Sequence, residues 1–413
     1  MWTDVKLNQL FDIGSSKRVL KSQWQQAGIP FYRGREVTRL SMDGFVNNEL
    51  FISEELYKEF LDKYGAPKRG DIMITAIGTI GNSYIVREKD WFYFKDASVL
   101  WLKKTSDVSS KFINYWLKSS YMKKQLDEGN GATVDTLTIR KLQTLRLKLP
   151  PLAEQKRIVA ILDEAFADID AAIANTEKNL ANARELFESY LNSLIGKLNL
   201  SWPEVGVDEA CDSIIGCINK TAPQVDYPTP YKMIRTTNVR NGQINLDSVK
   251  YVEEPVYRQW TRRQIPQKGD VILTREAPMG EVGVLNSDEN IFLGQRLVSY
   301  RADPEKLNNR FLFYCFLSGF IQGQIQKLGS GSTVLHMRVP DSKKLKIPLP
   351  TLNVQSGVVV ALDILNDETS RLKNISERKI TALNELKQSL LQKAFSGKLT
   401  GEVAKQKKDE AVA

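Results

Sequence analysis

Apolar residues recur with a seven-residue period along residues 153–195, a stretch that contains no proline and no glycine. The first heptad position holds Val159, Phe166, Ile173, Leu180, Phe187 and Leu194, and the second holds Leu162, Ile169, Thr176, Ala183 and Tyr190. Alternating spacings of four and three residues place one apolar seam along a helix, which is the pattern of coiled coils. The pattern predicts one long helix that ends at Gly196, because glycine commonly terminates helices.

A second, looser seam predicts another long helix that ends at Gly397. Its apolar positions are Val358, Leu362, Leu365, Leu372, Leu383, Leu386 and Leu390, and Thr369, Ser376 and Lys379 interrupt it. Because such a seam needs a covering partner, we expect the two helices to form an antiparallel coiled coil. The alternative is that each helix packs on its own domain. A helix of ~43 residues would be ~65 Å long, which exceeds the diameter of a small domain and argues against that alternative.

Before each helix, the chain alternates short β-rich runs, turn signals and short helical patterns. The predicted strands are 72–74, 98–101, 271–273 and 297–300, and the predicted short helices are 112–126 and 311–325. Prolines at 150–151 and 348–350 separate these parts from the long helices. We therefore predict an α+β fold in which two mixed α/β domains are separated by the two long helices.

The sequence repeats itself at a nearly fixed offset. Residues 70–75, Gly-Asp-Ile-Met-Ile-Thr, reappear 199 residues later as Gly-Asp-Val-Ile-Leu-Thr at 269–274. After one inserted residue, Leu-Pro-Pro-Leu at 149–152 reappears 200 residues later as Leu-Pro-Thr-Leu. Matches in this order predict an internal pseudo-two-fold repeat with copies at about 2–200 and 202–400.

Composition narrows the class of protein. The 413 residues are 42% apolar and 26% charged, which is ordinary for a globular protein and leaves room for two or three domains. No apolar run approaches the ~20 residues that span a bilayer, and the start of the chain lacks the features of a signal peptide. We therefore expect no membrane association. Three cysteines provide neither a disulfide framework nor metal-ligand spacing, so we also expect no bound metal and a cytoplasmic setting.

The formal net charge of +9 lies on the globular parts, which carry +10, whereas the helical parts carry −1. A basic surface favours a polyanion such as DNA, although many proteins are mildly basic. Basic clusters next to turn-like segments, and positions that differ between the two copies, supply the candidate DNA-contacting residues. These candidates are Arg33, Arg35, Arg39, Lys95, Arg235, Arg240, Arg275, Gln295, Arg296 and His336. Arginine can read guanine or neutralise phosphate, and a solvated surface cluster is the alternative for any one of them.

The sequence shows no catalytic constellation. The single histidine, His336, argues against zinc hydrolases and Ser-His-Asp enzymes, which both need histidine. The Asp/Asn-Pro-Pro-Tyr/Phe tetrapeptide of amino-methyltransferases is absent, and no glycine-rich loop has Walker A spacing. We therefore expect no catalytic residue in this chain.

Several segments resemble the specificity subunit of type I restriction–modification enzymes, and the resemblance covers essentially the whole chain. The matching segments are 70–75 with 78–81, Gly-Ala-Thr-Val at 131–134, Leu-Lys-Leu-Pro-Pro-Leu-Ala-Glu-Gln-Lys-Arg-Ile at 147–158, and Ala-Phe-Ser-Gly-Lys-Leu-Thr-Gly at 394–401. The segment at 147–158 is the most specific, because in this family it opens the central conserved helix. The second copy departs from it, since Asn353-Val354-Gln355-Ser356 replaces the usual Glu-Gln-Lys.

The resemblance implies a role for each part of the chain. Residues 1–150 and 199–350 would be target recognition domains, each reading one half of a bipartite, asymmetric site on double-stranded DNA. Residues 151–198 and 351–400 would be spacer helices, and 401–413 a charged tail. Two methyltransferase (modification) subunits would dock on the helices and domains, with Gln155, Arg157 and Gln355 as partner-binding residues.

The resemblance also implies that this chain binds no cofactor and catalyses nothing. S-adenosylmethionine would bind to the modification subunits, and ATP and Mg to restriction subunits where the system contains them. Two other interpretations stay open at this point. The chain would be a non-enzymatic scaffold that pairs protein partners without recognising DNA, or a stand-alone DNA methyltransferase or nuclease with cryptic motifs. Methyl transfer by the chain alone would favour the second of these.

Overall fold

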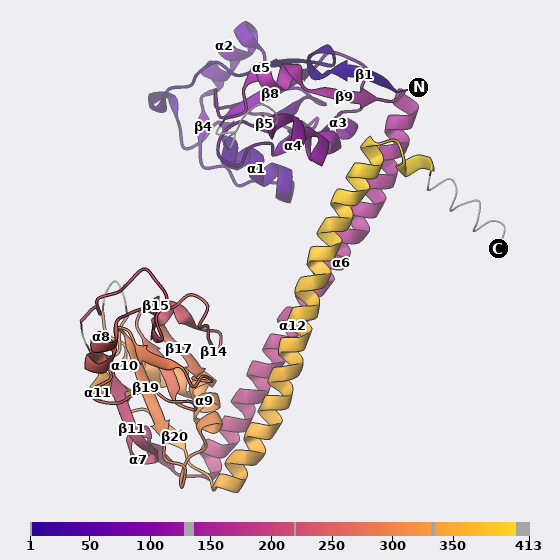
Figure 1. Ribbon diagram of the computed structural model, residues 1–413. Coiled ribbons are helices and arrows are strands. Elements are labelled where there is room, and N and C mark those ends of the chain that lie inside the picture. The colour runs from indigo at the N-terminus through magenta and orange to yellow at the C-terminus, as the bar shows by residue number, and fades with distance from the viewer. Residues whose placement is uncertain (1, 128–135, 219, 332–334, 402–413) are drawn as a thin grey trace, which may run out of the picture. The chain divides into compact units, whose positions relative to one another are not determined.

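The computed structural model describes residues 2–127, 136–218, 220–331 and 335–401 (Figure 1). The chain divides into two units, Met1–Thr176 with Arg378–Ala413, and Glu177–Glu377. Each unit holds one globular part and one half of each long helix, α6 (Leu152–Ser201) and α12 (Leu352–Phe395). The predicted motif at 131–134 and all but the first residue of the predicted tail lie outside the described residues. No helix in the described ranges is long and apolar enough to cross a membrane.

Unit 1 is built on two sheets and one strand pair. The four-stranded antiparallel sheet has the order β2 (Phe11–Gly14), β8 (Val99–Lys104), β5 (Ile72–Thr75), β6 (Ser83–Ile85). The three-stranded sheet has the order β4 (Phe51–Ile52), β3 (Ile29–Tyr32), β7 (Tyr93–Phe94), and β3 runs parallel to β7. Strand β1 (Thr3–Lys6) pairs with β9 (Arg146–Leu149), so the first and last strands of this globular part lie together.

Unit 2 repeats both sheets and the strand pair in the same strand order. The four-stranded sheet has the order β11 (Cys211–Gly216), β19 (Leu297–Ala302), β16 (Val271–Arg275), β17 (Met279–Val284). The three-stranded sheet has the order β15 (Lys250–Tyr251), β12 (Tyr231–Ile234), β18 (Asn290–Leu293), again with one parallel pair, β12 with β18. Strand β10 (Glu204–Gly206) pairs with β20 (Lys346–Pro348). The repeat predicted from the sequence is therefore confirmed in the order of the strands, and the predicted strands lie in or overlap β5, β8, β16 and β19.

The two copies differ directly after β3 and β12. In unit 1 the chain continues into α1 (Gly34–Asp43). In unit 2 it forms η3 (Thr236–Asn238) and a hairpin of β13 (Val239–Arg240) and β14 (Gln243–Ile244). Asn241 and Gly242 close this hairpin with positive φ angles of 53° and 77°, as a type I′ turn requires. Equivalent places on one scaffold thus carry different elements.

The short helices predicted at 112–126 and 311–325 are each broken in two by a serine. They form α3 (Ser110–Leu117) with α4 (Ser120–Asp127), and α9 (Asn309–Leu317) with α10 (Gly319–Leu328). At the breaks, the hydroxyls of Ser119 and Ser318 donate to the carbonyls of Trp116 and Cys315, which competes with the helical ladder. The remaining helices are η1 (Leu7–Gln9), η2 (Lys21–Gln23), α2 (Glu54–Tyr64), α5 (Ile139–Thr144), α7 (Val207–Ala210), α8 (Glu254–Trp260) and α11 (Val339–Ser342).

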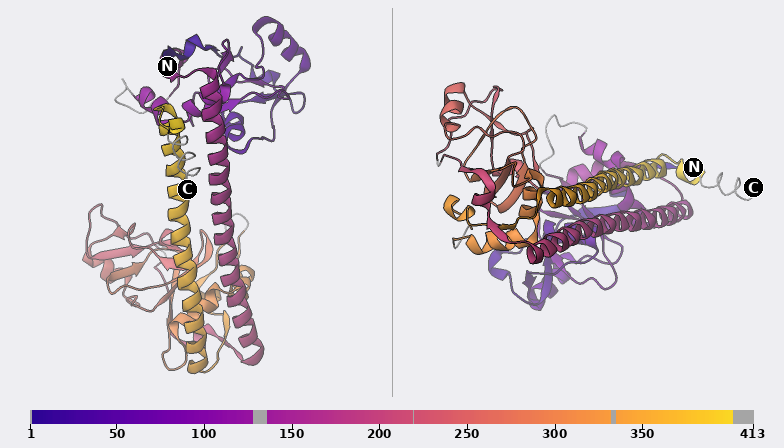
Figure 2. Two further views of the ribbon diagram at one scale, coloured as in Figure 1. Left: turned by 90° about the vertical axis from the view of Figure 1, so that its right-hand side faces the viewer. Right: turned by 90° about the horizontal axis from the view of Figure 1, so that it is seen from below.

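Both long helices contribute to the largest apolar core of each unit. In unit 1, Val159 and Leu162 of α6 join Leu391 and Phe395 of α12. In unit 2, Leu191 and Ile195 of α6 join Val359 and Leu362 of α12. The early part of each helix therefore packs with the late part of the other, which confirms the predicted antiparallel pairing (Figures 1 and 2).

The seam of α12 differs from the predicted one. Leu372 and Leu386 are exposed, whereas Ser376 is buried and Thr369 half-buried. Thr369 and Ser376 were predicted to interrupt the seam, and they do lie on it and face the interior, whereas Leu372 and Leu386, which were predicted to fill it, do not. The hydroxyl of Thr369 donates to the Leu365 carbonyl (2.8 Å), so its burial leaves no unpaired donor. In α6, Tyr190 is likewise exposed and Leu191 takes its place.

The prediction that the first helix ends at Gly196 is wrong. Helix α6 continues to Ser201 and ends before Pro203. Ile195 and Leu198 pack on the core of unit 2, and this burial outweighs the cost of about 1 kcal/mol for a glycine inside a helix. The prediction for Gly397 is confirmed, since it follows the end of α12 with a φ of 78°.

Candidate nucleic-acid interface

Backbone contacts gather the basic candidates of unit 1 around the ends of β3, β5 and β7. The Lys95 amide donates to the Tyr32 carbonyl (2.8 Å), and the Ala76 amide donates to the Ser98 carbonyl (2.9 Å). A Cβ on Gly34 would lie 3.7 Å from the Ser98 carbonyl oxygen. The start of α1 therefore lies beside the segments that carry Ala76 and Lys95. We call residues 33–39, 76–82 and 95–98 the unit 1 tip.

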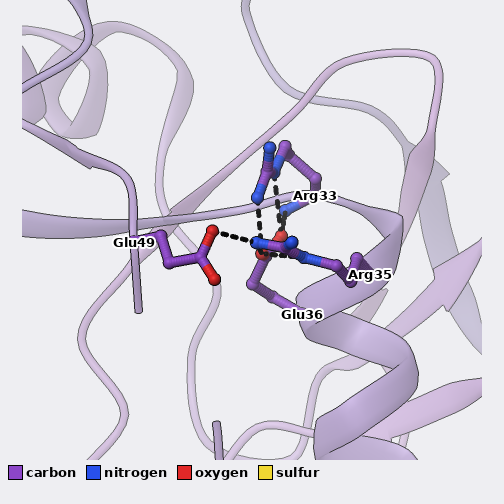
Figure 3. Close-up of polar contacts among 4 residues, drawn as sticks. All are labelled: Arg33, Arg35, Glu36 and Glu49. Atoms are coloured by element: carbon purple, nitrogen blue, oxygen red, sulfur yellow. Dashed lines mark hydrogen bonds and ion pairs between the residues drawn. The ribbon is translucent and has the colours of Figure 1, made fainter. Parts of the chain in front are cut away.

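A buried carboxylate organises the arginines of the unit 1 tip (Figure 3). Arg33 donates through Nε and Nη2 to both oxygens of Glu36 (3.1 and 2.8 Å). Arg35 donates through Nε to Glu36 (3.0 Å) and through Nη2 to Glu49 (2.6 Å). Burial alone would raise the pKa of Glu36, but the hydrogen bonds from the two arginines outweigh it and hold this pKa below its ordinary value. The carboxylate stays ionised at neutral pH and fixes both guanidinium groups.

Two other candidates at the unit 1 tip are less constrained. Arg39 on α1 and Lys95 after β7 are exposed, and no acidic side chain of the described ranges pairs with either one. A cation that is exposed and unpaired can meet a phosphate without first breaking an ion pair. The unit 1 tip thus combines two held arginines with two solvated cations.

Contacts around the loop between β16 and β17 gather the candidates of unit 2. The Arg275 amide donates to the Arg296 carbonyl (2.8 Å), and the Met337 amide donates to the Arg275 carbonyl (2.9 Å). The Nη2 atom of Arg240 donates to the Ala277 carbonyl (3.2 Å). The segment with Gly294 also lies next to Arg235, since a Cβ on Gly294 would lie 3.3 Å from Cγ of Arg235. We call residues 235–242, 275–281, 294–297 and 336–337 the unit 2 tip.

Several side chains of the unit 2 tip already have partners. Arg240 donates to the Val239 carbonyl through Nη1 (2.7 Å), and Arg275 donates to the Met337 carbonyl through Nη1 (2.7 Å). Arg296 pairs with Glu276 (3.3 Å). Gln295 accepts weakly from the Thr221 hydroxyl (3.5 Å), and His336 is exposed. The structure therefore brings these candidates together, and some guanidinium N–H groups of Arg240 and Arg275 already donate to backbone carbonyls.

Two guanidinium donors in unit 2 lack acceptors. The Nε atoms of Arg235 and Arg275 are buried and have no hydrogen-bond partner among the described residues. Leaving a buried donor unpaired costs about 1–3 kcal/mol, so native proteins rarely leave such groups unsatisfied. Because Trp24, Asn48 and Asn199 carry such atoms outside the two tips, this feature is compatible with a binding role for both arginines and does not rank the candidates of unit 2.

The two tips share a backbone feature but differ in its side chain. Ala97 and Arg296 are equivalent in the repeat, and both have positive φ angles, 60° and 71°. This region is unfavourable for residues other than glycine, and such strain concentrates at functional sites. The side chain at this position is a methyl group in unit 1 and a guanidinium in unit 2. The scaffold thus presents different chemistry at one place.

The predicted partner-binding glutamines have another role in the structure. Gln155 and Gln355 are 2% and 0% exposed, and their amides bond to the backbone of their own units. They anchor the starts of α6 and α12 within their own units, and a contact of either glutamine with a second protein stays a prediction. Arg157 is exposed, with one long contact to the Thr400 carbonyl (3.5 Å), so partner binding by Arg157 stays a prediction.

Sequence reasoning missed the acidic side chains of these sites. Glu36 and Glu49 hold the arginines of the unit 1 tip, and Asp163 and Asp363 bind α3 and α9 to the long helices. The repeat offset of 200 relates Asp163 to Asp363, but Glu177 with Glu377 and Glu185 with Glu385 recur at the same offset, so the repeat alone did not single out this pair. Within the described ranges, no group of three or more His, Cys, Asp or Glu residues could hold a metal ion.

A family model described as the type I restriction modification DNA specificity domain matches residues 1–181 and 211–382. A putative type I restriction enzyme specificity subunit from Haemophilus influenzae is 31% identical over 196 residues, or 45% of this chain and 48% of that protein. The chain thus spans about half the length of that relative. The type I restriction enzyme MjaVIII specificity subunit from Methanocaldococcus jannaschii is 23% identical over 373 residues, or 86% of this chain and 81% of that protein.

Solved structures share the fold. A chain from a study of complex assembly and conformational transition of the type I R-M system superposes with a TM-score of 0.73 at 18% identity, covering 96% of this chain and 98% of that one. The HsdS subunit from Thermoanaerobacter tengcongensis superposes with a TM-score of 0.55 at 18% identity, covering 96% and 97%. Likeness at this level of identity establishes the architecture of two repeats with a central and a C-terminal helix.

Proposed function

The chain belongs to the type I restriction–modification DNA specificity family, and from that premise we propose that its two units read the two halves of one DNA site. Each tip would contact one half-site from its own unit. Because the tips differ, the two half-sites would differ, and the whole target would be asymmetric. The protein would choose where a modification complex acts and would leave the chemistry to other subunits.

One observation carries this proposal: two copies of one scaffold present different basic tips. The strand orders are the same in both units, whereas α1 in one unit is replaced by η3 and the β13–β14 hairpin in the other. A scaffold that paired two protein partners through similar surfaces would not require basic tips that differ in this way. Arginine is the side chain that reads guanine bidentately and also neutralises phosphate.

The proposed contacts with DNA fall into two kinds. Arg39 and Lys95 in unit 1 are exposed cations suited to phosphates, whereas we assign the reading of base edges in unit 2 to Arg235 and Arg275, because guanidinium groups can pair with guanine. The other proposed contacts are Arg33, Arg35, Arg240, Gln295, Arg296 and His336. The two half-sites would lie about one helical turn apart, ~34 Å, if both are read from one face of the DNA.

The long helices would act as a spacer and as the docking site for partners. Two modification subunits would dock on the helices and units and transfer a methyl group from S-adenosylmethionine to adenine. Restriction subunits, where present, would use ATP and Mg. The chain itself would bind no cofactor and hold no catalytic residue, and it would act in the cytoplasm, where its three free cysteines stay reduced.

The test is to co-express the full chain with the modification subunit of its own system and to sequence methylated adenines in the host genome. We expect one asymmetric two-part motif, and no methyl transfer when the chain is incubated alone with labelled S-adenosylmethionine. A complex that forms but neither binds nor methylates DNA would overturn the proposal in favour of a protein scaffold. Methyl transfer by the isolated chain would instead identify an enzyme.

A further inference from the structure

The first turns of each long helix are attached at two polar points to the globular part that precedes them, α6 in unit 1 and α12 in unit 2. The same two points occur in both copies of the repeat. The first is a glutamine in the first turn, Gln155 of α6 and Gln355 of α12. The second is an aspartate two turns later, Asp163 and Asp363. We call the two points of each helix a clamp.

The glutamine joins three segments of one unit. The Ser109 amide donates to Oε1 of Gln155 (2.9 Å), and Nε2 of Gln155 donates to the Pro150 carbonyl (2.9 Å). In unit 2, the Asn308 amide donates to Oε1 of Gln355 (2.8 Å), and Nε2 of Gln355 donates to the Pro350 carbonyl (2.8 Å). Ser109 and Asn308 are the N-cap residues of α3 and α9. Each glutamine therefore ties the start of a long helix to the start of a neighbouring helix.

The aspartate binds the same neighbouring helix further along. Asp163 accepts from the Tyr115 hydroxyl (2.7 Å) and from the Lys111 ammonium (2.7 Å), both on α3. In unit 2, Asp363 accepts in the same way from the hydroxyl of Tyr314 and the guanidinium of Arg310, on α9. Burial and the neighbouring carboxylate raise the pKa of Tyr115 and of Tyr314, so both phenols remain donors at neutral pH.

Two points fix a direction, whereas one point allows a pivot. Eight residues of helix separate the points by ~12 Å. Between them, Leu162 and Leu362 are fully buried in the cores of the two units. Apolar packing alone tolerates small shifts and repacking, but a buried amide must keep its partners or lose about 1–3 kcal/mol. The polar points therefore select one orientation of a helix that the core would hold less specifically.

We propose that the clamps are positioning elements that set the direction in which each long helix leaves its unit, and thereby the single spacer length that the complex accepts between half-sites. This inference rests on the proposed function, because only a two-part site has a spacer. Residues 152–176 of α6 extend ~36 Å, so a change of about 5° at the clamp displaces their far end by ~3 Å, nearly the rise of one base pair. A small loosening would thus admit a neighbouring spacer.

The experiment uses the full chain assembled with its modification subunit and a plasmid library in which the spacer is up to two base pairs shorter or longer. Methylated adenines are read by sequencing. Wild type is expected to methylate one spacer length. Asp163→Ala combined with Asp363→Ala, and separately Gln155→Leu, should raise methylation of spacers one base pair away by about tenfold relative to the preferred one, because each variant removes polar contacts that hold the start of a long helix. The half-site sequences should not change.

Two controls separate positioning from stability. Glu254→Ala removes an exposed ion pair with Arg258 on α8, away from the clamps, and should keep the wild-type spacer choice. Asp163→Asn with Asp363→Asn keeps an acceptor for each tyrosine hydroxyl and should restore much of the selectivity. Circular dichroism verifies folding. Gln155→Leu leaves the Ser109 amide without its acceptor, so if this variant fails to fold, the aspartate variants carry the test.

The outcomes distinguish this inference from the function on which it rests. If the folded Asp→Ala variant keeps the single wild-type spacer and loses only total activity, the clamps are merely structural and the inference is overturned while the proposed function stands. If wild type itself methylates no two-part site, the proposed function fails first, whatever the variants do. Broadened spacer choice with unchanged half-sites is the result that supports the inference.

Discussion

Glu36 determines what the arginines of the unit 1 tip can do. Its buried carboxylate holds Arg33 with two hydrogen bonds and shares Arg35 with the exposed Glu49. A guanidinium held in this way loses little rotamer freedom on binding, but a phosphate must compete with the carboxylate. Arg33 is therefore mainly structural, and Arg35, whose outer partner Glu49 is exposed to solvent, is better placed to exchange that partner for DNA.

We predict that Glu36→Gln lowers the free energy of unfolding of unit 1 by about 2–3 kcal/mol, because it removes one partner from a buried, charge-assisted network. Urea denaturation followed by tryptophan fluorescence measures the change. Glu49→Gln is the matched control. Glu49 is 61% exposed, so its loss should leave the denaturation midpoint unchanged within error.

The same network gives a pH dependence with a defined sign. The pKa of Glu36 lies below its ordinary value of 4.5, so its stabilisation is fully present above that value and is lost as the pH falls through the lowered pKa. The stability difference between wild type and Glu36→Gln should stay constant from about pH 7 to 5 and shrink below about pH 4. A difference that is unchanged at the lowest pH would contradict this assignment.

At the unit 2 tip, we predict that Arg235→Ala and Arg275→Ala each weaken binding of the intact target by about 1–3 kcal/mol and relax the choice of base in one half-site. Lys95→Ala should instead weaken binding of all sequences alike and reduce the salt dependence by about one ion. Fluorescence anisotropy with half-site mutants at several salt concentrations measures both effects. If Arg235→Ala and Arg275→Ala left methylation and its sequence choice untouched, the assignment of these residues would be wrong.

The sequence predicted which cations gather but not what holds them. Arg235 and Arg240 lie in one segment and Arg275 in another, and the sequence pointed to the first two as a basic cluster next to a turn-like segment. The partners of Arg240 and Arg275 are backbone carbonyls that tertiary contacts bring close. In unit 1, Arg35 likewise pairs with Glu49, which lies 14 residues away in the sequence. Heptad spacing and composition carry no information about such pairs.

At the scale of elements, periodicity predicted the long helices well and their ends less well. The heptad positions of α6 up to Phe187 are buried or half-buried. In α12, burial follows the position in the helix even where the residue is Thr369 or Ser376, because geometry decides which face meets the partner. Tertiary packing also explains why the predicted helix end at Gly196 was wrong. Residues on both sides of Gly196 pack on the core of unit 2, so the helix continues through the glycine.

We predict that inserting four residues next to Ala181 of α6 either lengthens the accepted spacer or abolishes activity. Four residues add ~6 Å of helix, close to the rise of two base pairs, and rotate the following turn by about 40°. Sequencing of methylated adenines reports the spacer. The same insertion at Ser287, in the exposed loop between β17 and β18, is the control and should leave the spacer unchanged. An unchanged site after the insertion at Ala181 would refute the role of the helices as a spacer.

At the scale of the whole molecule, the two ends of the sequence build unit 1 together. Leu391, Ala394 and Phe395 of α12 belong to the core of unit 1, and the Phe395 ring meets that of Phe112 edge to face at 5.2 Å. A Cβ on Gly397 would lie 3.7 Å from the Trp2 ring. Residues almost 400 positions apart therefore complete one core, whereas unit 2 needs no residue outside Glu177–Glu377.

This arrangement predicts an asymmetric response to damage at the end of α12. Phe395→Ala should destabilise unit 1 by about 3–5 kcal/mol, the usual cost of removing a buried phenylalanine side chain, and should leave unit 2 unaffected. Limited proteolysis with mass spectrometry measures which unit becomes easier to cleave. We expect increased cleavage in residues 2–127 and continued protection in 220–331. The exposed Leu386→Ala on the same helix is the control. Equal loss of protection in both units would show that they do not behave as separate cores.

The order in which the units can be completed during synthesis follows from the same division of the chain. A ribosome adds about 5–20 residues each second, so the stretch between residues 176 and 378 takes about 10–40 s to make. Unit 2 has all of its residues when that stretch is finished, while unit 1, begun first, still lacks the last turns of α12. The N-terminal unit is therefore the later one to mature, and nascent-chain chaperones should meet its open core for longest.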